Sequence, residues 1–386
     1  MQVYQNIRYK IKYKGWVIIS MQKSYIKPFD GLRFIAMLIV FLTHLGFMKV
    51  VPECDTFYEN YLHFGEMGVT VFVILSGFLM SYLYLEKFES LNFSKAKKFV
   101  LNRVIRVYPV YILTVIIMIP FSIIAFKGKF VAFFVTLFSN IFLIQDLFPL
   151  KAVYLSFNSA AWTLSCLFIL WICTPFLLLL FNKANLNKTK VLLTIYGIYL
   201  LGVTMVSLFY NGSNIGLWYF YYSPFFKTID YTIGMLLGVF VARYSAGSKI
   251  TSCNYNVLEI LSLALFILAY CFRHKVSKGL LLDIWWLPFA AILIFSLSYQ
   301  KGILSKILST KLFEYLGKIS FSFYLIHYPI IRYTMTFTDK LKLQHTVTTV
   351  VIQSVFMFAF SMLCASLLYK YVEIPLARLI KNKINT

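Results

Sequence analysis

An arginine and a histidine eleven residues apart in one apolar stretch are the first residues whose types and spacing could support chemistry. Arg33 stands near the start of the stretch and His44 lies deep within it. On an α-helix, eleven residues return to within roughly 20° of the same face and rise about 16 Å along the axis. Ionisable side chains are costly on such a stretch and usually functional. One face could hold a phosphate at Arg33 and a reactive group near His44, which suits a long, anionic donor such as an acyl-CoA.

Asp30, Arg33 and the pair Arg103 and Arg106 also have structural explanations. Arg33 is close enough to the end of its apolar stretch to extend its charge to the membrane surface. Asp30 could cap the helix, which is the role we favour, or pair with Arg33 one turn later. Arg103 and Arg106 would share a helix face. They either add to a cytoplasmic excess of cations or make paired phosphate contacts.

Three further groups place polar or small side chains in apolar runs. Ser76 and Gly77 allow either close helix packing or the approach of a substrate to the backbone. Trp162 and Ser165 open another run and are candidates for acceptor contact or proton handling. A third group combines a tyrosine and a histidine just before a proline that would kink the helix, namely Tyr324, His327 and Pro329. Such a pair can handle protons or form a satisfied hydrogen bond between helices.

The elements that must position these residues are membrane helices. With 60% hydrophobic and 13% charged residues over 386 positions, the chain is too apolar for a soluble domain. Apolar runs near the roughly 20 residues that cross a bilayer predict an all-α, polytopic membrane protein with about ten transmembrane helices. The predicted spans are 30–50, 66–86, 104–126, 160–182, 190–210, 225–242, 255–272, 281–299, 316–335 and 347–370.

An excess of cations, 37 Lys and Arg against 14 Asp and Glu, gives the chain a net charge of +23. The cations lie in short segments between apolar runs, so we expect contact with membrane lipid and none with nucleic acid. If the apolar segment 130–149 does not cross the membrane, most of these cations fall on one side. We therefore expect 130–149 to be interfacial or re-entrant, and both termini to be cytoplasmic.

No repeat or long linker divides the sequence. We expect a basic cytoplasmic segment at 1–28, one membrane domain at 29–372 and a basic cytoplasmic tail at 373–386. Translation could start at Met1 or at Met21. The six cysteines are scattered without CxxC or Cys/His spacing, so we expect neither a disulfide framework nor a metal site.

Together these residues resemble the acyltransferase-3 family of bacterial membrane O-acyltransferases. The family's Arg and His separated by ten residues fall on Arg33 and His44, and its Arg-x-x-Arg element falls on Arg103 and Arg106. Its Ser-Gly-Phe element falls on 76–78. Each element is a weak signal alone, but several in the family's order along nearly the whole chain are a strong one.

The resemblance implies transfer of an acyl group, usually acetyl, from cytoplasmic acetyl-CoA to a hydroxyl of a cell-surface polysaccharide or lipid-linked glycan. It implies a protein of the bacterial cytoplasmic membrane with no permanently bound cofactor. His44 would be the general base or acyl-handling group, since a neutral imidazole can deprotonate a positioned hydroxyl. Arg33 would position the donor, together with Arg103, Arg106, Ser76 and Gly77. The residues expected to contact the acceptor or handle protons are Asp30, Trp162, Ser165, Tyr324 and His327.

One position departs from the family's pattern. Many members carry a glutamate two residues after the last serine of Trp-Ser-Leu-Ser, where this chain has Leu167 two residues after Ser165. The run 160–182 contains no carboxylate at all. The difference bears on acid–base chemistry or on acceptor binding.

Two other functions remain open from the sequence. Intramembrane Arg and His on helices interrupted by Gly and Pro would also suit a transporter or export factor for a glycan intermediate. Inverted repeats would favour a transporter, but the two halves of the sequence show no convincing similarity. The third option is a membrane scaffold whose polar residues only lock helices together. The absent glutamate favours a scaffold, whereas the presence of Arg33 and His44 at the family's spacing argues against it.

Overall fold

The computed structural model describes residues 9–13, 16–20, 25–90, 92–183, 186–244 and 254–385. Within these ranges the chain is helical, apart from one antiparallel hairpin formed by β1 (Tyr9–Tyr13) and β2 (Trp16–Ser20). The all-α prediction is therefore confirmed for the membrane domain, and the hairpin is an addition within the N-terminal segment that the sequence analysis did not foresee.

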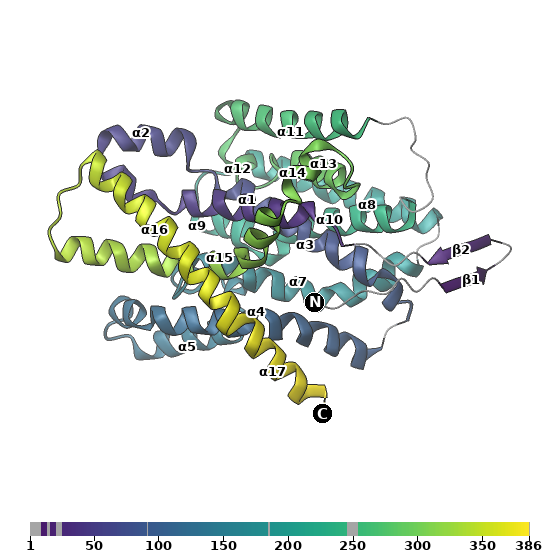
Figure 1. The fold of residues 1–386 in the computed structure, drawn as a ribbon, viewed down its shortest axis with the longest axis horizontal. Coiled ribbons are helices and arrows are strands. Elements are labelled where there is room, and N and C mark those ends of the chain that lie inside the picture. Colours follow the sequence, from purple (N-terminus) through teal and green to yellow (C-terminus); the bar gives the residue numbers. More distant parts are fainter. Residues whose placement is uncertain are drawn as a thin grey trace.

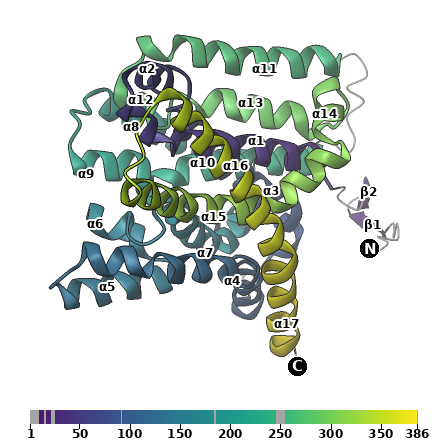
Figure 2. The ribbon, with the colours of Figure 1, turned by 60° about the vertical axis from the view of Figure 1, so that its left-hand side comes forward.

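The two ends of the helical bundle are marked by different elements. The hairpin lies at one end, whereas α2 (Pro52–Tyr61) and α9 (Asn214–Leu217) lie at the other (Figure 1, Figure 2). We call these the hairpin end and the α2 end. Because α1 (Pro28–Thr43) follows the hairpin and leads towards α2, the start and finish of this helix lie at opposite ends.

The remaining helices follow in a regular order. Those of the first part are α3 (Gly65–Tyr84), α4 (Phe93–Ala125), α5 (Phe130–Ile141), α6 (Lys151–Tyr154), α7 (Trp162–Lys183) and α8 (Leu186–Leu208). Those of the second part are α10 (Pro224–Tyr244), α11 (Tyr255–Phe272), α12 (Lys278–Leu281), α13 (Leu287–Ser298), α14 (Ile303–Leu308), α15 (Lys311–Lys340), α16 (Val347–Leu368) and α17 (Ile374–Asn385).

Short turns join several of these helices. They are η1 (Gly46–Val50), η2 (Leu85–Lys87), η3 (Gln145–Leu147), η4 (Ser159–Ala161) and η6 (Arg273–Lys275), together with two π-helical turns, η5 (Trp218–Tyr222) and η7 (Tyr369–Glu373). The π-helical turn η5 links α9 to α10 at the α2 end, and η7 links α16 to α17.

Seven helical segments in the described part of the chain are long and apolar enough to cross a membrane. They contain α1, α3, α4, α7, α10, α11 and α16. The protein is therefore a membrane protein, as predicted, but the predicted count of ten spans is not confirmed.

The other predicted spans are helices too. α13 has only twelve residues, which rise about 18 Å, whereas α8 has 23, and its crossing stays a prediction because some of its side chains lie outside the described residues. α15 is long enough but carries Glu314, Lys318, Arg332 and Asp339. The segment predicted to be interfacial or re-entrant contains α5, also a helix of 12 residues.

Glycines bring α3 and α10 into backbone contact. A Cβ atom on Gly77 would meet the backbone carbonyl of Tyr231, and one on Gly234 would meet the backbone of α3. At the same crossing, the Ser81 hydroxyl donates to the carbonyl oxygen of Met235 at 2.7 Å. Such close packing of small residues is a common way for helices to associate in a membrane.

The start of α1 is fixed in the same way against α14 and α15. A Cβ atom on Gly31 would meet the backbone carbonyl of Leu308, and one on Gly317 would meet Asp30. α1 also packs on α3, where Gly68 lies against the carbonyl of Ala36. The helix that carries Arg33 and leads directly to His44 is thus held on two sides.

Candidate active site

Two histidines from distant parts of the sequence meet where α1 ends. His44 is the residue directly after the last residue of α1, and His327 lies on α15. Their ring centroids are 4.9 Å apart and the ring planes meet at 71°. The structure therefore brings together two side chains that the sequence had singled out independently.

Each histidine directs Nδ1 at a carbonyl one turn back on its own helix. Nδ1 of His44 lies 2.8 Å from the oxygen of Val40, and Nδ1 of His327 lies 3.3 Å from the oxygen of Phe323. Because a carbonyl oxygen can only accept, Nδ1 carries the proton of each neutral ring and Nε2 keeps the lone pair. Nε2 of His327 is buried and has no hydrogen-bond partner among the described residues. The pair is arranged to accept a proton.

Aromatic rings surround the two imidazoles. Phe323 stacks on His327 with a centroid separation of 6.1 Å, and Phe41 approaches the same ring edge-on at 6.0 Å. Tyr328 lies 5.7 Å from the ring of His44. These contacts fix the planes of both imidazoles and limit the water around them, which strengthens local electrostatic interactions.

The loop after α1 is tied down beside His44. The Thr43 hydroxyl donates to the carbonyl of Leu62 at 2.9 Å and accepts from the backbone N–H of Phe64 at 3.0 Å. The Tyr58 hydroxyl donates to the carbonyl oxygen of Thr43 at 2.5 Å. α2 and the start of α3 are thus anchored to the residue before the histidine.

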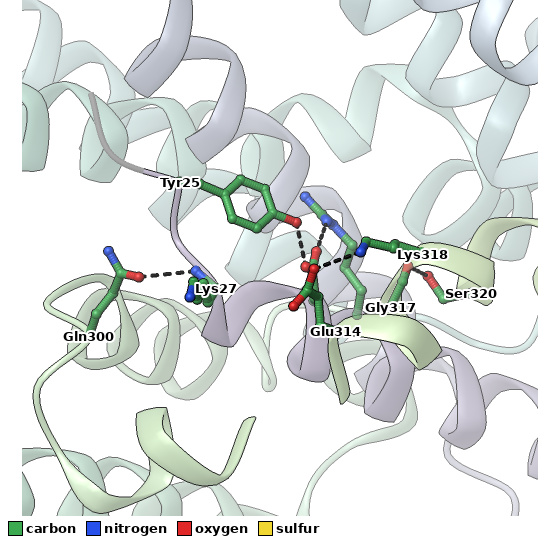
Figure 3. Close-up of polar contacts among 9 residues, drawn as sticks. Tyr25, Lys27, Gln300, Glu314, Gly317, Lys318 and Ser320 are labelled. Atoms are coloured by element: carbon green, nitrogen blue, oxygen red, sulfur yellow. Dashed lines mark hydrogen bonds and ion pairs between the residues drawn. The ribbon is translucent and has the colours of Figure 1, made fainter. Parts of the chain in front are cut away.

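A charged cluster lies at the opposite end of α1. Arg33 donates to Asp30 at 2.8 Å, and the Tyr25 hydroxyl donates to the same carboxylate. Lys318 of α15 lies beside this group and donates to Glu314 at 2.6 Å (Figure 3). The Asp30 side chain is 2% exposed and that of Arg33 is 27% exposed, so the carboxylate is enclosed while part of the arginine side chain stays accessible.

Asp30 does not cap α1, which corrects the favoured sequence interpretation. α1 begins at Pro28, its N-cap position is Lys27, and no side chain caps it by a hydrogen bond. Proline supplies the start because it has no N–H group to satisfy. Asp30 lies inside the first turn, where its carboxylate pairs with Arg33, the other role considered from the sequence.

Arg103 and Arg106 are both on α4 but have different surroundings. The Arg103 guanidinium lies over the ring of Tyr84 at 4.9 Å, over that of Phe99 at 5.6 Å, and donates to the Tyr84 hydroxyl. Arg106 is exposed and makes no hydrogen bond or ion pair within the described ranges, yet its charge acts on Arg33. Arg106 also acts on the buried carboxyl of Glu373, so the cations of α1 and α4 lie in a region that contains acidic side chains as well.

Ser76 and Gly77 lie in the middle of α3. Gly77 occupies the crossing with α10 described above, so its lack of a side chain is explained by packing. Contact of Ser76 or Gly77 with a donor stays a prediction.

Trp162, Ser165 and Tyr324 lie around the start of α7. Trp162 packs on the rings of Tyr221 and Tyr222 at 4.8 and 4.7 Å. The Ser165 hydroxyl donates to the carbonyl of Leu143 at 2.9 Å. The hydroxyls of Tyr324 and Thr163 are 2.5 Å apart, and the Tyr324 ring lies 5.9 Å from that of His327.

The sequence analysis missed a buried charge network between α10 and the turn that precedes α13. Lys227 pairs with Asp283 at 2.9 Å and with Asp230 at 3.5 Å, and none of the three is more than 1% exposed. The Thr70 hydroxyl donates to Asp283 at 2.7 Å. The signal was present, because Lys227 and Asp230 are ionisable residues one turn apart in a predicted span.

Asp146 was missed as well. This aspartate lies in η3 and is fully buried, and burial raises the pKa of its carboxyl well above its usual value. It is the single acid of the segment 130–149, which the sequence analysis predicted to be interfacial or re-entrant without singling out a residue in it. In the described part of the chain, no group of three or more His, Cys, Asp or Glu side chains gathers to hold a metal ion.

Comparison with known proteins places this helical membrane architecture in a known class. The model of a family described as an acyltransferase domain matches residues 26–370. The chain belongs to this acyltransferase-3 family, as its sequence elements had indicated.

Several curated proteins are similar over most of this chain. Peptidoglycan O-acetyltransferase OatA of Listeria monocytogenes is 26% identical over 92% of the chain and 56% of its own length. O-acetyltransferase OatA of Staphylococcus aureus is 22% identical over 92% of the chain and 57% of its own length. Acyltransferase MdmB of Streptomyces mycarofaciens is 22% identical over 78% of each protein. The chain thus spans little more than half the length of the OatA relatives. No solved structure matches it.

Proposed function

We propose that the protein is a membrane O-acyltransferase that moves an acetyl group from acetyl-CoA to a hydroxyl of a cell-surface glycan. Membership of the acyltransferase-3 family and similarity to two O-acetyltransferases support this activity. One of these relatives is a peptidoglycan O-acetyltransferase, so a peptidoglycan-type glycan is the first acceptor to test. The observation that carries the proposal is the contact between the rings of His44 and His327.

His44 is the general base in this proposal. Its Nδ1 is engaged by the carbonyl of Val40, which leaves Nε2 to take the proton of the acceptor hydroxyl. The hydroxyl oxygen then bonds to the thioester carbonyl carbon while the carbon–sulfur bond breaks. The departing CoA sulfur takes the proton from the imidazolium. General base catalysis of this kind contributes about 10²–10⁴-fold to a rate.

His327 is a positioning residue beside this base. Once His44 has taken up the proton, its N–H group can donate a hydrogen bond to the unpartnered Nε2 of His327. Sharing the proton in this way would stabilise the charged state that forms during transfer, because hydrogen bonds to charged groups are stronger than those between neutral groups.

Arg33 and Arg106 bind the phosphates of acetyl-CoA. Arg33 keeps 27% of its side chain exposed while held by Asp30, and Arg106 is exposed with no ion-pair partner among the described residues. Guanidinium groups suit phosphates because they offer several donors in a planar fork. Since acetyl-CoA is cytoplasmic, the hairpin end would face the cytoplasm, and with it both termini of the chain. The α2 end would face outwards in the cytoplasmic membrane of a bacterium.

Transfer of label from acetyl-CoA tests the proposal. The purified protein is reconstituted in lipid vesicles with [¹⁴C]acetyl-CoA and peptidoglycan glycan strands, and glycan-bound label is counted. Wild type and a His274→Ala control, altered at an exposed histidine of η6, should transfer label. His44→Ala should lose at least 100-fold in rate. No transfer by wild type to any glycan offered, alongside glycan flux across the vesicles, would contradict the proposal in favour of a transporter.

A further inference from the structure

The carboxyl of Asp146 is buried without a partner for one of its oxygens. Asp146 is fully buried in η3, and its Oδ1 atom has no hydrogen-bond partner among the described residues. Its other oxygen, Oδ2, accepts from the weak S–H donor of Cys166 at 3.6 Å, and the Ser165 hydroxyl and the Cys166 backbone N–H act on the same carboxyl. Buried polar atoms are almost always hydrogen-bonded, so Oδ1 is an acceptor open to a donor beyond the described residues.

The backbone of Asp146 fixes this carboxyl where two elements meet. Its carbonyl accepts from the indole N–H of Trp218 in η5 at 2.9 Å, and its N–H donates to the Ser165 hydroxyl of α7 at 3.4 Å. The Cys166 thiol also donates to the carbonyl of Tyr222 at 3.0 Å. η3, α7 and η5 are thus joined around one acid.

Aromatic rings stand on the η5 side of this acid. The Trp162 ring lies 4.7 Å from that of Tyr222, and the Tyr154 ring lies 4.7 Å from Tyr222 on another side. Trp162 and Tyr154 are buried, whereas Tyr222 is only partly so. Aromatic faces with a polar group that fixes orientation are what a ligand with both apolar faces and hydroxyl groups requires.

Tyr324 connects this region to the histidine pair. Its hydroxyl is 2.5 Å from that of Thr163 near the start of α7, and its ring lies 5.9 Å from the ring of His327. Asp146, through its contact with Ser165, and Tyr324, through its contact with Thr163, therefore both meet the start of α7. α7 itself offers no acid in this place, because residue 167 is leucine.

We propose that Asp146, with the rings of Trp162 and Tyr222, forms the acceptor subsite, in which the Asp146 carboxyl accepts a hydrogen bond from a hydroxyl of a saccharide. The inference rests on the proposed function, because it names the acceptor side of the same site. Asp146 brings to the start of α7 a carboxyl that α7 lacks.

Saccharide binding without any donor tests this subsite independently of transfer. The probe is chitotetraose, a β-1,4-linked N-acetylglucosamine oligomer, titrated by calorimetry against the protein in lipid nanodiscs. Asp146→Asn keeps the shape of the side chain and should weaken binding at least tenfold. The control Asp339→Asn, at an exposed acid at the far end of α15, should leave binding within twofold of wild type. Equal affinity of Asp146→Asn and wild type, or no binding by wild type, would overturn the inference.

A steady-state assay separates this inference from the proposed function. In acetyl transfer, Asp146→Asn should raise the KM for the glycan at least tenfold and leave the KM for acetyl-CoA within twofold. Asp146→Asn with Leu167→Glu should recover part of the loss by supplying the carboxyl from α7. Absence of transfer by wild type, with chitotetraose binding that still depends on Asp146, would reject the acetyl transfer and retain the subsite. If Asp146→Asn does not fold, Tyr222→Leu takes its place, and unchanged chitotetraose affinity in that variant would overturn the inference.

Discussion

The ring of His44, at the end of α1, lies 4.9 Å from the ring of His327 on α15. The sequence alone could not show that these two residues are in contact, since one lies near the start of the chain and the other in its last third. Their contact joins His44, which belongs to the family's Arg and His element, to His327, for which the sequence also allowed a hydrogen bond between helices as the whole explanation. The same contact makes the pair, rather than His44 alone, the unit whose chemistry can be tested.

Arg106 should affect donor binding, whereas Arg103 should affect stability. Arg106→Gln is expected to raise the KM for acetyl-CoA about tenfold or more, because one hydrogen bond to a charged group contributes roughly 1.5–3 kcal/mol. Arg103→Gln removes a cation from the rings of Tyr84 and Phe99, so it should lower stability by roughly 1–2 kcal/mol instead. Steady-state kinetics and thermal unfolding in detergent separate the two. Equal donor KM values for both variants would contradict the division of roles.

Gly77 should tolerate no side chain. A Cβ atom there would collide with the backbone of Tyr231, so Gly77→Val is expected to separate α3 from α10 and reduce the folded yield. Gly202→Val in α8 is the matched control, because open space surrounds Gly202. Size-exclusion profiles and unfolding temperatures report the outcome. A folded Gly77→Val protein with an altered donor KM would instead favour the donor contact predicted from the sequence.

The buried network of Lys227 should be essential for stability. Lys227→Met leaves Asp230 and Asp283 buried without their cation, so a loss of about 3–5 kcal/mol is expected. Lys227→Met combined with Asp283→Leu and Asp230→Leu removes the whole network and should recover much of that loss. Reversible unfolding in mixed micelles measures both variants. A triple variant no more stable than Lys227→Met would show that the network does more than neutralise charge.

Much of the fold followed from the sequence because bilayer crossing leaves a simple signature. Long apolar runs predicted helices, and each of the ten predicted spans contains one. The count of ten was not confirmed: α13 is only twelve residues long, and α15 carries charged residues along its length. The pairing of Gly77 with α10 was also beyond the sequence, since it depends on which helices become neighbours.

The candidate site was predicted less completely than the fold. Arg33 lies in α1 and His44 directly follows it in the same apolar run, so periodicity alone related them to each other. Asp146 is a single acid in apolar surroundings, and its partner Cys166 comes from another element. Lys227 has Asp230 one turn away, but its closer partner Asp283 also comes from another element. The role of Asp30 was misjudged because a proline and not a side-chain cap starts α1.

The most direct test of the central claim is a double-mutant cycle on the histidine pair. Acetyl transfer is measured for wild type, His44→Ala, His327→Ala and the double variant at saturating donor and glycan. If the two rings act as one unit, the double variant will be within a few-fold of His44→Ala, since effects of residues that act together are not additive. A rate in His44→Ala equal to that of wild type, or losses that multiply in the double variant, would contradict the account.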